Sequence, residues 1–232
     1  MRLLEYVKKT RRMLIWGVRC FPSKGEFGAF GINSTLEYPT TIDCIKSVFV
    51  ENDVTVRDNL RIINTPDERV VIKQYSVLSS GVTIITNSHR STIGIPHFLL
   101  GPSHINDRTG DVLIDEDVWV GANATILANV HLGRGCVVAA GALVTESVPP
   151  YTLVAGTPAR IQKRVFSAEQ VIRHEQTLYP PHKRTDVGKL LYLSENSFQD
   201  SEVFGVEFPS GNNSFSVLDK IKKELHYVGW KE

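Results

Sequence analysis

A repeat of six residues runs through the middle of this chain and constrains its fold more than any other feature. Every sixth residue is aliphatic at Ile114, Val120, Ile126, Leu132, Val138 and Val144. The residues four positions later are also apolar, namely Val118, Ala124, Val130, Cys136, Ala142 and Val148. An α-helix repeats about every 3.6 residues and a strand about every 2, so neither element alone produces this period. The repeat is typical of a parallel β-helix, in which short strands stack coil upon coil.

The same period is weaker toward the N-terminus and is interrupted twice. The earlier aliphatic positions are Val50, Val56, Ile62, Ile72, Leu78 and Ile84. The first interruption, near residues 65–68, shifts the frame of the repeat. The second is longer, from residue 90 to about residue 111, and contains two prolines and three glycines. Because long loops inside a regular fold are uncommon and often functional, we expect a protruding loop at about 90–111 with a site beside it.

The chain divides into three expected segments. These are an N-terminal helix and loop segment at 1–43, the β-helix at 44–166, and a C-terminal helix and extension at 167–232. The repeat ends at Pro149 and Pro150, because proline lacks the N–H group that a strand ladder needs. Ser167 is a favourable helix N-cap, which predicts a helix over 168–178, and a second helix is expected over 216–226.

Composition and charge narrow the range of functions. The net charge of +1 gives no general affinity for nucleic acid. The three cysteines lack the spacing of a metal site or of a disulfide framework, so the cytoplasm is the expected location. No apolar stretch reaches the length of a membrane span. Residues 1–20 carry six basic side chains; we favour a helix packed on the body or on a neighbouring subunit over weak association with an anionic membrane surface.

The C-terminal part of the repeat resembles a known family. The stretch VWVGANATILANVHLGRGCVVAAGALVTESVPPYTLVAGTPARIQKRVF, residues 118–166, is similar to the hexapeptide-repeat acyltransferases. This resemblance implies a left-handed β-helix, a homotrimer with sites between subunits, and acetyl-CoA as the donor with no metal. The left hand rests on the resemblance alone, because β-crossovers are normally right-handed.

In that family the catalytic base lies at the end of a repeat strand, just before the long loop. His89 occupies this place in the segment Thr86-Asn87-Ser88-His89-Arg90. Histidine has an unperturbed pKa of about 6.5, which suits it to removing a hydroxyl proton near neutral pH. The resemblance and this chemistry together assign His89 as the general base that activates the acceptor for attack on the thioester.

Four further polar residues are weighed for a role in acceptor binding. Asn87 could hold the acceptor or the acyl oxygen, or could be a corner asparagine that tolerates a left-handed backbone, and both interpretations stay open. In the family the long loop reaches toward a neighbouring subunit and helps to close the site, so His97 and His104 could touch substrate. His131 occupies the same place in its hexad as His89. We interpret it as a turn residue, with a place in the site wall as the alternative.

The donor needs a groove for its pantetheine arm and a place for its phosphates. Small residues let the arm approach the backbone, and basic side chains suit phosphates. The residues that match the family's donor site or supply these features are Trp119, Gly121, Ala139, Ala140, Gly156, Thr157, Arg160 and Lys163. A solvated basic face is the alternative for the last two. Cys136 is excluded as an acyl carrier, because a buried cysteine in the hexad is inert. The acidic run at residues 115–117 is interpreted as a solvated turn.

The sequence and the resemblance together predict an O-acetyltransferase that moves the acetyl group of acetyl-CoA directly to a sugar or surface-polysaccharide unit. The acceptor class is suggested by the layout of a short N-terminal section, a hexad domain and a long loop after the histidine. N-acetylation of an amino sugar, and a xenobiotic or serine acetyltransferase, are the open alternatives. A scaffold or metalloenzyme is disfavoured, since within the repeat only His89 and His131 are available as imidazole ligands.

Overall fold

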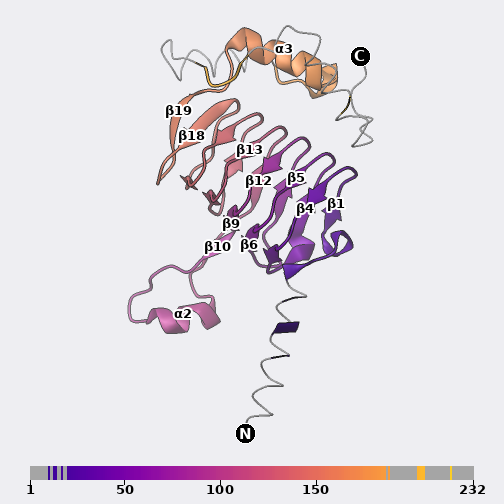
Figure 1. The fold of residues 1–232 in the computed structure, drawn as a ribbon. Helices are drawn as coiled ribbons and strands as arrows, with labels where there is room; N and C mark the ends of the chain where they lie inside the picture. The colour runs from indigo at the N-terminus through magenta and orange to yellow at the C-terminus, as the bar shows by residue number, and fades with distance from the viewer. Residues whose placement is uncertain are drawn as a thin grey trace.

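The computed structural model describes residues 20–186 and 203–206, together with the single residues Thr10, Met13, Leu14, Gly17, Gly188 and Lys220. The helices expected over 1–20 and 216–226 lie outside the described residues, apart from these single positions. Figure 1 shows an elongated coil of short strands with one excursion beside it and helix α3 across one end. Among the described residues, no helix is both long enough and apolar enough to cross a membrane.

Three sheets form the walls of the coil. The first sheet contains β1 (Ala29–Phe30), β4 (Val48–Val50), β7 (Val70–Ile72), β12 (Val112–Ile114) and β15 (His131–Leu132). The second contains β2 (Thr35–Leu36), β5 (Thr55–Val56), β8 (Val77–Leu78), β13 (Trp119–Val120), β16 (Val137–Val138), β18 (Thr152–Ala155) and β19 (Arg160–Arg164). The third contains β3 (Thr41–Ile42), β6 (Arg61–Ile63), β9 (Thr83–Ile85), β14 (Thr125–Ile126) and β17 (Leu143–Val144).

The chain visits the three sheets in turn, and each strand pairs in parallel with the strand one coil away. Thus β7, β8 and β9 pair with β12, β13 and β14 of the next coil. At the C-terminal end β19 instead pairs antiparallel with β18. The parallel sheets confirm the predicted mainly-β architecture of stacked coils, and the hand of the coil stays a prediction.

The hexad positions meet inside the coil in register. In the first sheet Val50 aligns with Ile72, Ile72 with Ile114, and Ile114 with Leu132. All four side chains are buried. Strands of two or three residues are not stable in isolation. Their stability comes from the stack of buried aliphatic side chains inside the coil, where burying each side chain contributes about 1.5–3 kcal/mol.

The coil begins earlier than the sequence-based boundary at residue 44. The strands β1, β2 and β3 already pair with β4, β5 and β6 and form a first coil. Its inward residues Phe30, Leu36 and Ile42 also lie six positions apart. The short helix η2 (Ile45–Ser47) lengthens the next corner, so Ile42 and Val50 lie eight positions apart and the period is hidden. Before this coil, η1 (Lys24–Glu26) forms a single turn.

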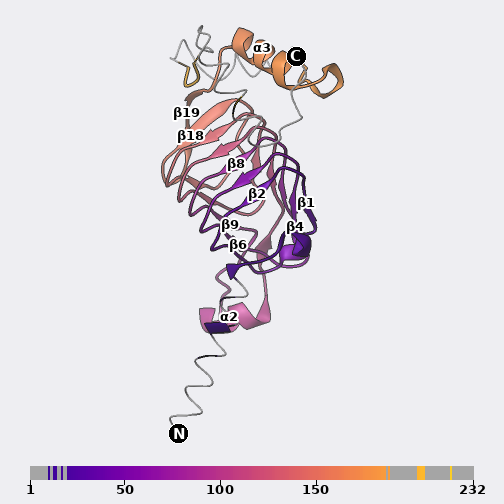
Figure 2. The same cartoon turned by 45° about the vertical axis from the view of Figure 1, so that its right-hand side comes forward.

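The long interruption of the repeat leaves the coil as an excursion on a two-stranded stem. Strands β10 (Asn87–Ser88) and β11 (Arg108–Thr109) pair antiparallel and form the stem. Helix α2 (His97–Ser103) lies at its far end. Both ribbon views show α2 standing clear of the coil (Figures 1 and 2). The excursion therefore presents its side chains outside the packed walls.

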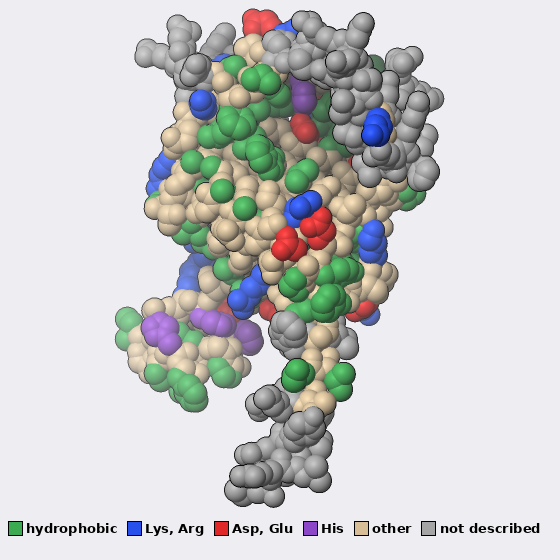
Figure 3. Space-filling model, in the orientation of Figure 1, with side chains coloured by type: hydrophobic (Ala, Val, Ile, Leu, Met, Phe, Trp, Pro, Cys, Tyr) green, Lys and Arg blue, Asp and Glu red, His purple; other side chains and the backbone are tan. Residues whose placement is uncertain are grey.

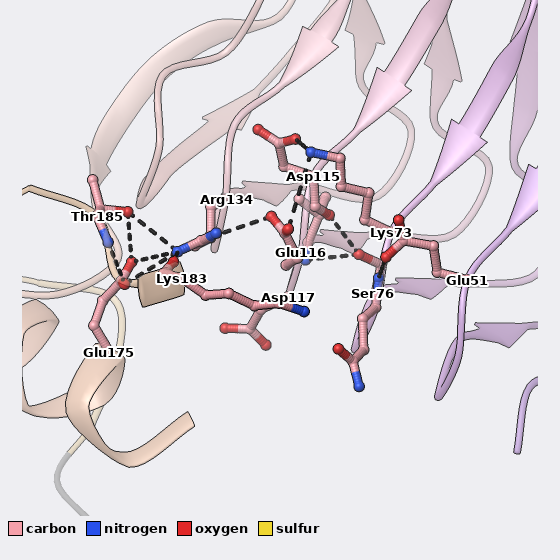
Figure 4. A network of polar contacts seen from close by, with 12 residues as sticks. Glu51, Lys73, Ser76, Asp115, Glu116, Asp117, Arg134, Glu175, Lys183 and Thr185 are labelled. Carbon is pink, nitrogen blue, oxygen red and sulfur yellow. Dashed lines mark hydrogen bonds and ion pairs between the residues drawn. The ribbon is translucent and has the colours of Figure 1, made fainter. Parts of the chain in front are cut away.

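Helix α3 (Ala168–Leu178) follows β19 and is joined to η3 (Pro181–Lys183). Its N-cap is Ser167, whose hydroxyl accepts a hydrogen bond from the Gln170 N–H, as the sequence predicts. A polar network ties α3 to the coil (Figure 4). Arg134 donates to Glu175 of α3 at 3.1 Å and to the Lys183 carbonyl at 2.8 Å. The Nε–H group of Arg134 donates to Glu116 of the coil at 3.3 Å.

Candidate active site

The stem of the excursion places a histidine opposite a carboxylate. In the β10–β11 register Asn87 faces Thr109 and Ser88 faces Arg108, so His89 and Asp107 are the next pair along the stem. The Nδ1 atom of His89 lies 2.7 Å from Oδ1 of Asp107. The pair thus results from backbone pairing between residues 18 apart in sequence.

A second histidine shares the same carboxylate. His104 is the C-cap of α2 and has a left-handed backbone, with φ of 51°. Its Nδ1 atom lies 2.9 Å from Oδ2 of Asp107, and the His89 and His104 ring centroids are 5.7 Å apart. Hydrogen bonds from His89 and then from His104 lower the pKa of Asp107, so the carboxylate is ionised at neutral pH. Histidine side chains gather on the excursion in Figure 3.

This arrangement sets the tautomer of His89. An ionised carboxylate only accepts hydrogen bonds, so Nδ1 of His89 must carry the proton. The neutral ring then has its lone pair on Nε2, which is the form a general base requires. The His89 side chain is 39% exposed. Nε2 lies near Gly101 of α2, where an added Cβ atom would be 3.9 Å away, at ordinary van der Waals distance.

A shallow depression adjoins the pair. Its lining residues are Arg90, Ser91, Thr92, Ile93, Asn106 and Asp107. Asn87 begins β10, two residues before His89, which follows the strand. His97 takes a different partner, because its Nε2 atom lies 3.0 Å from the Ser91 hydroxyl. The structure therefore groups His89, His104 and Asp107, with Asn87 nearby in the stem and His97 in a separate contact.

Asp107 was not singled out from sequence. It lies in the irregular loop, where no repeat indicates its neighbours. The available signal was that the end of the loop could pair with its beginning as a hairpin stem, since the residues up to Asp111 lead directly into the next repeat strand at Val112. Pairing from that end places Asp107 beside His89.

The acidic run at residues 115–117 is not a solvated turn, because each member has its own partner. Asp115 binds Lys73 at 2.7 Å and Nε2 of His131 at 2.6 Å. Glu116 binds Arg134, and Asp117 binds Nε2 of His174 on α3 at 2.8 Å. The run is a structural link between the first sheet and α3, and His131 is part of it.

Most donor-site candidates gather at the edge between the second and third sheets. Gly121 packs against the backbone there, since an added Cβ would lie 2.5 Å from the Ala140 nitrogen and 2.8 Å from the Ala139 carbonyl carbon. Thr157 hydrogen-bonds the Gly141 carbonyl at 3.5 Å, and Leu143 N–H donates to the Gly156 carbonyl. These small residues leave a narrow edge that an extended chain can approach.

The backbone at this edge is partly occupied by the coil itself. The Ala139 N–H donates to the Val154 carbonyl, and the Gly141 N–H donates to the Ala122 carbonyl. Backbone pairing with pantetheine amides, expected from sequence, therefore cannot use these two donors without breaking the coil. The edge is therefore better suited to contact the pantetheine arm through its shape than through these backbone hydrogen bonds.

Trp119, Arg160 and Lys163 lie on the outer face of the second sheet. Trp119 is opposite Val137, Val137 is opposite Leu153, and Leu153 is opposite Lys163. A register shift in the β18–β19 pair then sets Arg160 opposite Ala155, on the same face as Lys163. Trp119 is 48% exposed, and its indole N–H donates to the Ser79 hydroxyl at 3.2 Å.

Within one chain the two groups of candidates occupy different edges of the coil. His89 follows the third sheet, at the corner that leads to the first sheet. The small residues lie between the second and third sheets, and the basic residues lie on the second. Cys136 belongs to neither group, since it is fully buried in the core and burial strongly raises the pKa of its thiol.

Comparison with known proteins finds hexapeptide-repeat proteins both by sequence and by structure. Residues 111–146 match the family model "Bacterial transferase hexapeptide (six repeats)". A hexapeptide-repeat-containing acetyltransferase of Vibrio cholerae, solved with acetyl coenzyme A, superposes with a TM-score of 0.55 and 26% identity. The superposition covers 62% of this chain and 74% of that one. Residues 111–146 thus match a hexapeptide-repeat family model, and the coil resembles that of an acetyltransferase.

Curated relatives point the same way over shorter stretches. A 2,3,4,5-tetrahydropyridine-2,6-dicarboxylate N-acetyltransferase of Staphylococcus aureus is 57% identical over 58 residues, which are 25% of this chain. The match spans about a quarter of that relative's length, 24%. A probable macrolide acetyltransferase of Lysinibacillus sphaericus is 32% identical over 116 residues, 45% of this chain and 64% of the relative.

Proposed function

We propose that this protein is an acetyl-CoA-dependent O-acetyltransferase whose acceptor is a hydroxyl of a sugar or surface-polysaccharide unit. The observation that carries the proposal is the exposed imidazole of His89, held through Nδ1 by Asp107 at 2.7 Å. The resemblance of the coil to acetyltransferases, one of them solved with acetyl coenzyme A, supplies the donor. Xenobiotic and serine acceptors use the same chemistry and are the alternatives.

The transfer is direct. Nε2 of His89 takes the proton of the acceptor hydroxyl while its oxygen attacks the thioester carbonyl carbon. The tetrahedral intermediate then collapses, the carbon–sulfur bond breaks, and the proton passes to the departing thiolate. The products are an acetyl ester and free coenzyme A. Asp107 orients the ring and stabilises the imidazolium that forms, in the way a carboxylate supports histidine in other acyl transfers.

The donor would lie along the edge that contains Gly121, Ala139, Ala140, Gly156 and Thr157. Arg160 and Lys163 share a face beside it and are suited to the nucleotide phosphates. Because this edge and His89 lie at different corners of one coil, we place the complete site between two copies in a homotrimer. A left-handed coil, as the resemblance implies, is part of this proposal.

The open shape of the site supports the proposed acceptor class. The depression beside Asp107 is shallow and its walls come from one excursion, so it suits part of a bulky glycan better than an enclosed small molecule. The Staphylococcus aureus relative is an N-acetyltransferase, so an amino sugar is a specific second candidate. A sugar panel that contains matched hydroxyl and amino compounds distinguishes the two by the bond formed.

The central test replaces His89. We expect His89→Ala to lower the transfer rate by about 10²–10⁴-fold, because the acceptor loses its general base. The assay follows release of coenzyme A with each acceptor of the panel. His131→Ala is the matched control, since it also removes a histidine paired with an aspartate but lies on the first sheet. Near-normal turnover of the His89 variant would overturn the assignment.

A second test addresses the donor site. Reversing the charge of Arg160 or Lys163 to Glu should raise the KM for acetyl-CoA far more than the KM for the acceptor. Arg69→Glu, on an exposed ion pair at another corner, is the control. An unchanged KM for acetyl-CoA would remove these two residues from the donor site.

A further inference from the structure

We propose that His89, His104 and Asp107 also form a binding site for a divalent transition-metal ion of the zinc class, and that metal binding inhibits the enzyme. The binding itself stands on geometry alone. The inhibition rests on the proposed function, in which His89 is the base. The metal is a regulator that competes with catalysis, and the proposed reaction does not require it.

The three ligand atoms already converge. Nδ1 of His89, Nδ1 of His104 and a carboxylate oxygen of Asp107 lie within 4.8 Å of one another. Each nitrogen is 2.7 or 2.9 Å from an Asp107 oxygen. Metal–ligand bonds of about 2.1 Å at tetrahedral angles hold ligand atoms about 3.4 Å apart. Metal entry therefore requires the two hydrogen-bonded nitrogen–oxygen pairs to open by about 0.5–0.7 Å, with the metal replacing the two protons. The two nitrogens contact different oxygens of Asp107, so longer separations among the three ligand atoms, which reach at most 4.8 Å, must close toward the same value.

The donor set has a chemical preference. Two imidazoles and one carboxylate favour zinc, nickel, cobalt or iron(II) over calcium and magnesium, which prefer oxygen ligands. The side chains of His89 and His104 are 39% and 63% exposed. Solvent can therefore reach the site and supply the remaining ligands. A three-ligand site with open positions is the usual form of an exchangeable zinc site.

The backbone holds the three residues in place without long, flexible side chains. The antiparallel stem fixes His89 opposite Asp107, and the left-handed C-cap of α2 turns His104 toward them. Within the part of the chain that the structure describes, His131 with Asp115 and His174 with Asp117 each bring one imidazole to a carboxylate. The excursion alone brings two histidines to one carboxylate among these residues.

Metal binding and base catalysis exclude each other at His89. When Nδ1 donates its lone pair to a metal, the single proton of the neutral ring must sit on Nε2. Nε2 then has no lone pair for the acceptor hydroxyl. The metal also takes Asp107 away from the imidazolium that it would stabilise. Zinc bound here should therefore stop transfer without displacing acetyl-CoA.

The first experiment measures binding without any reference to activity. The full-length protein is titrated with Co²⁺, a spectroscopic substitute for Zn²⁺, and visible absorption bands of a site with nitrogen ligands are recorded. We expect one Co²⁺ per chain, and at least tenfold weaker binding in His104→Gln and in His89→Gln. His97→Gln, a change on the same helix, should bind as the native protein does. Absence of bands, or native binding by His104→Gln, overturns the site.

The second experiment tests inhibition. Zn²⁺ should lower the transfer rate of the native protein, and a chelator should restore it. The inhibition constant should rise at least tenfold in His104→Gln, measured against that variant's own zinc-free rate. Cobalt binding in a protein that lacks transferase activity supports the site and refutes the proposed function. Metal binding with full transfer in zinc refutes the inhibition.

Discussion

His89 and His131 each contact an aspartate, but through different ring nitrogens, and this difference determines which nitrogen is left for a substrate. His89 contacts Asp107 through Nδ1, so its outer nitrogen, Nε2, is left to meet a substrate. His131 contacts Asp115 through Nε2 at 2.6 Å, so the Asp115 carboxylate already occupies the nitrogen that corresponds to the outer nitrogen of His89. Asp115 is also bound by Lys73, which makes this pair part of a structural link. The two histidines thus share a place in the hexad but engage opposite ring nitrogens, and in the proposed function only His89 presents Nε2 to a substrate.

The role of Asp107 can be tested by Asp107→Asn. The amide would donate to Nδ1 of His89 and so favour the tautomer with its proton on Nε2, which cannot act as a base. We expect kcat to fall by about 10²-fold with little change in either KM, because the residue orients the base and does not hold substrate. Steady-state kinetics with both substrates checks this.

Asp111→Asn is the control for this change. Asp111 is an aspartate four residues further on, paired with Arg69 instead of a histidine. It should keep the native kcat. A loss confined to KM in the Asp107 variant, or an equal loss of kcat in both variants, would show that Asp107 does not orient His89.

At the scale of elements, the sequence predicted what the repeat enforces and missed what irregular pairing decides. The inward positions from Val50 to Val144 follow from a period that a stacked coil requires. The first coil was missed because η2 lengthens a corner and breaks that period. Asp107 was missed because the stem pairs residues across an irregular loop. The six-residue period predicts which positions of the repeat face inward. It does not predict contacts between segments that lack the repeat.

The link between α3 and the coil depends on Arg134. Arg134→Ala would leave Glu175, whose side chain is 3% exposed, as a buried carboxylate without its cation. We expect this to lower the free energy of unfolding by about 3 kcal/mol. Arg69→Ala removes a cation from an exposed pair and should cost under about 1 kcal/mol. Urea unfolding of both variants measures the difference, and equal losses would contradict the structural role of the link.

The same link predicts an acid sensitivity. Burial by itself raises the pKa of Glu175, whereas hydrogen bonds from Thr185 and Tyr151 lower it. The charge of Arg134 adds to them, and the net effect is a lowered pKa. A carboxyl with a lowered folded-state pKa stabilises the protein above its unfolded pKa of about 4.3. That stabilisation is lost as the pH falls through the folded-state value.

Glu175→Gln should therefore make the free energy of unfolding less dependent on pH under acidic conditions. Between about pH 5 and pH 3, the free energy of unfolding of the native protein should fall more steeply than that of the variant. Urea unfolding at stepped pH gives both slopes. Glu169→Gln, at an exposed position in the first turn of the same helix, should keep most of the native slope. Parallel slopes for native and Glu175→Gln proteins would refute the linkage.

On the scale of the whole molecule, the triangular coil separates His89, the proposed base, from the edge that we propose for the donor. The structure offers His89 at one corner and the small residues around Gly121 at another. A trimer with sites between copies resolves this separation, because each copy can lend its base to the donor edge of the next. Size measurement should then give a mass near three times that of the 25.9 kDa chain.

Complementation between two inactive chains tests the shared site directly. One chain has His89→Ala, and the other has Ala140→Trp, which places a bulky ring at an exposed corner of the donor edge. In randomly mixed trimers, one interface in four joins an intact base to an intact edge, so about a quarter of native activity should return. Mixing His89→Ala with a chain that has both changes should restore nothing. If tagged mixed trimers form and remain inactive, the base and the donor edge act within a single chain.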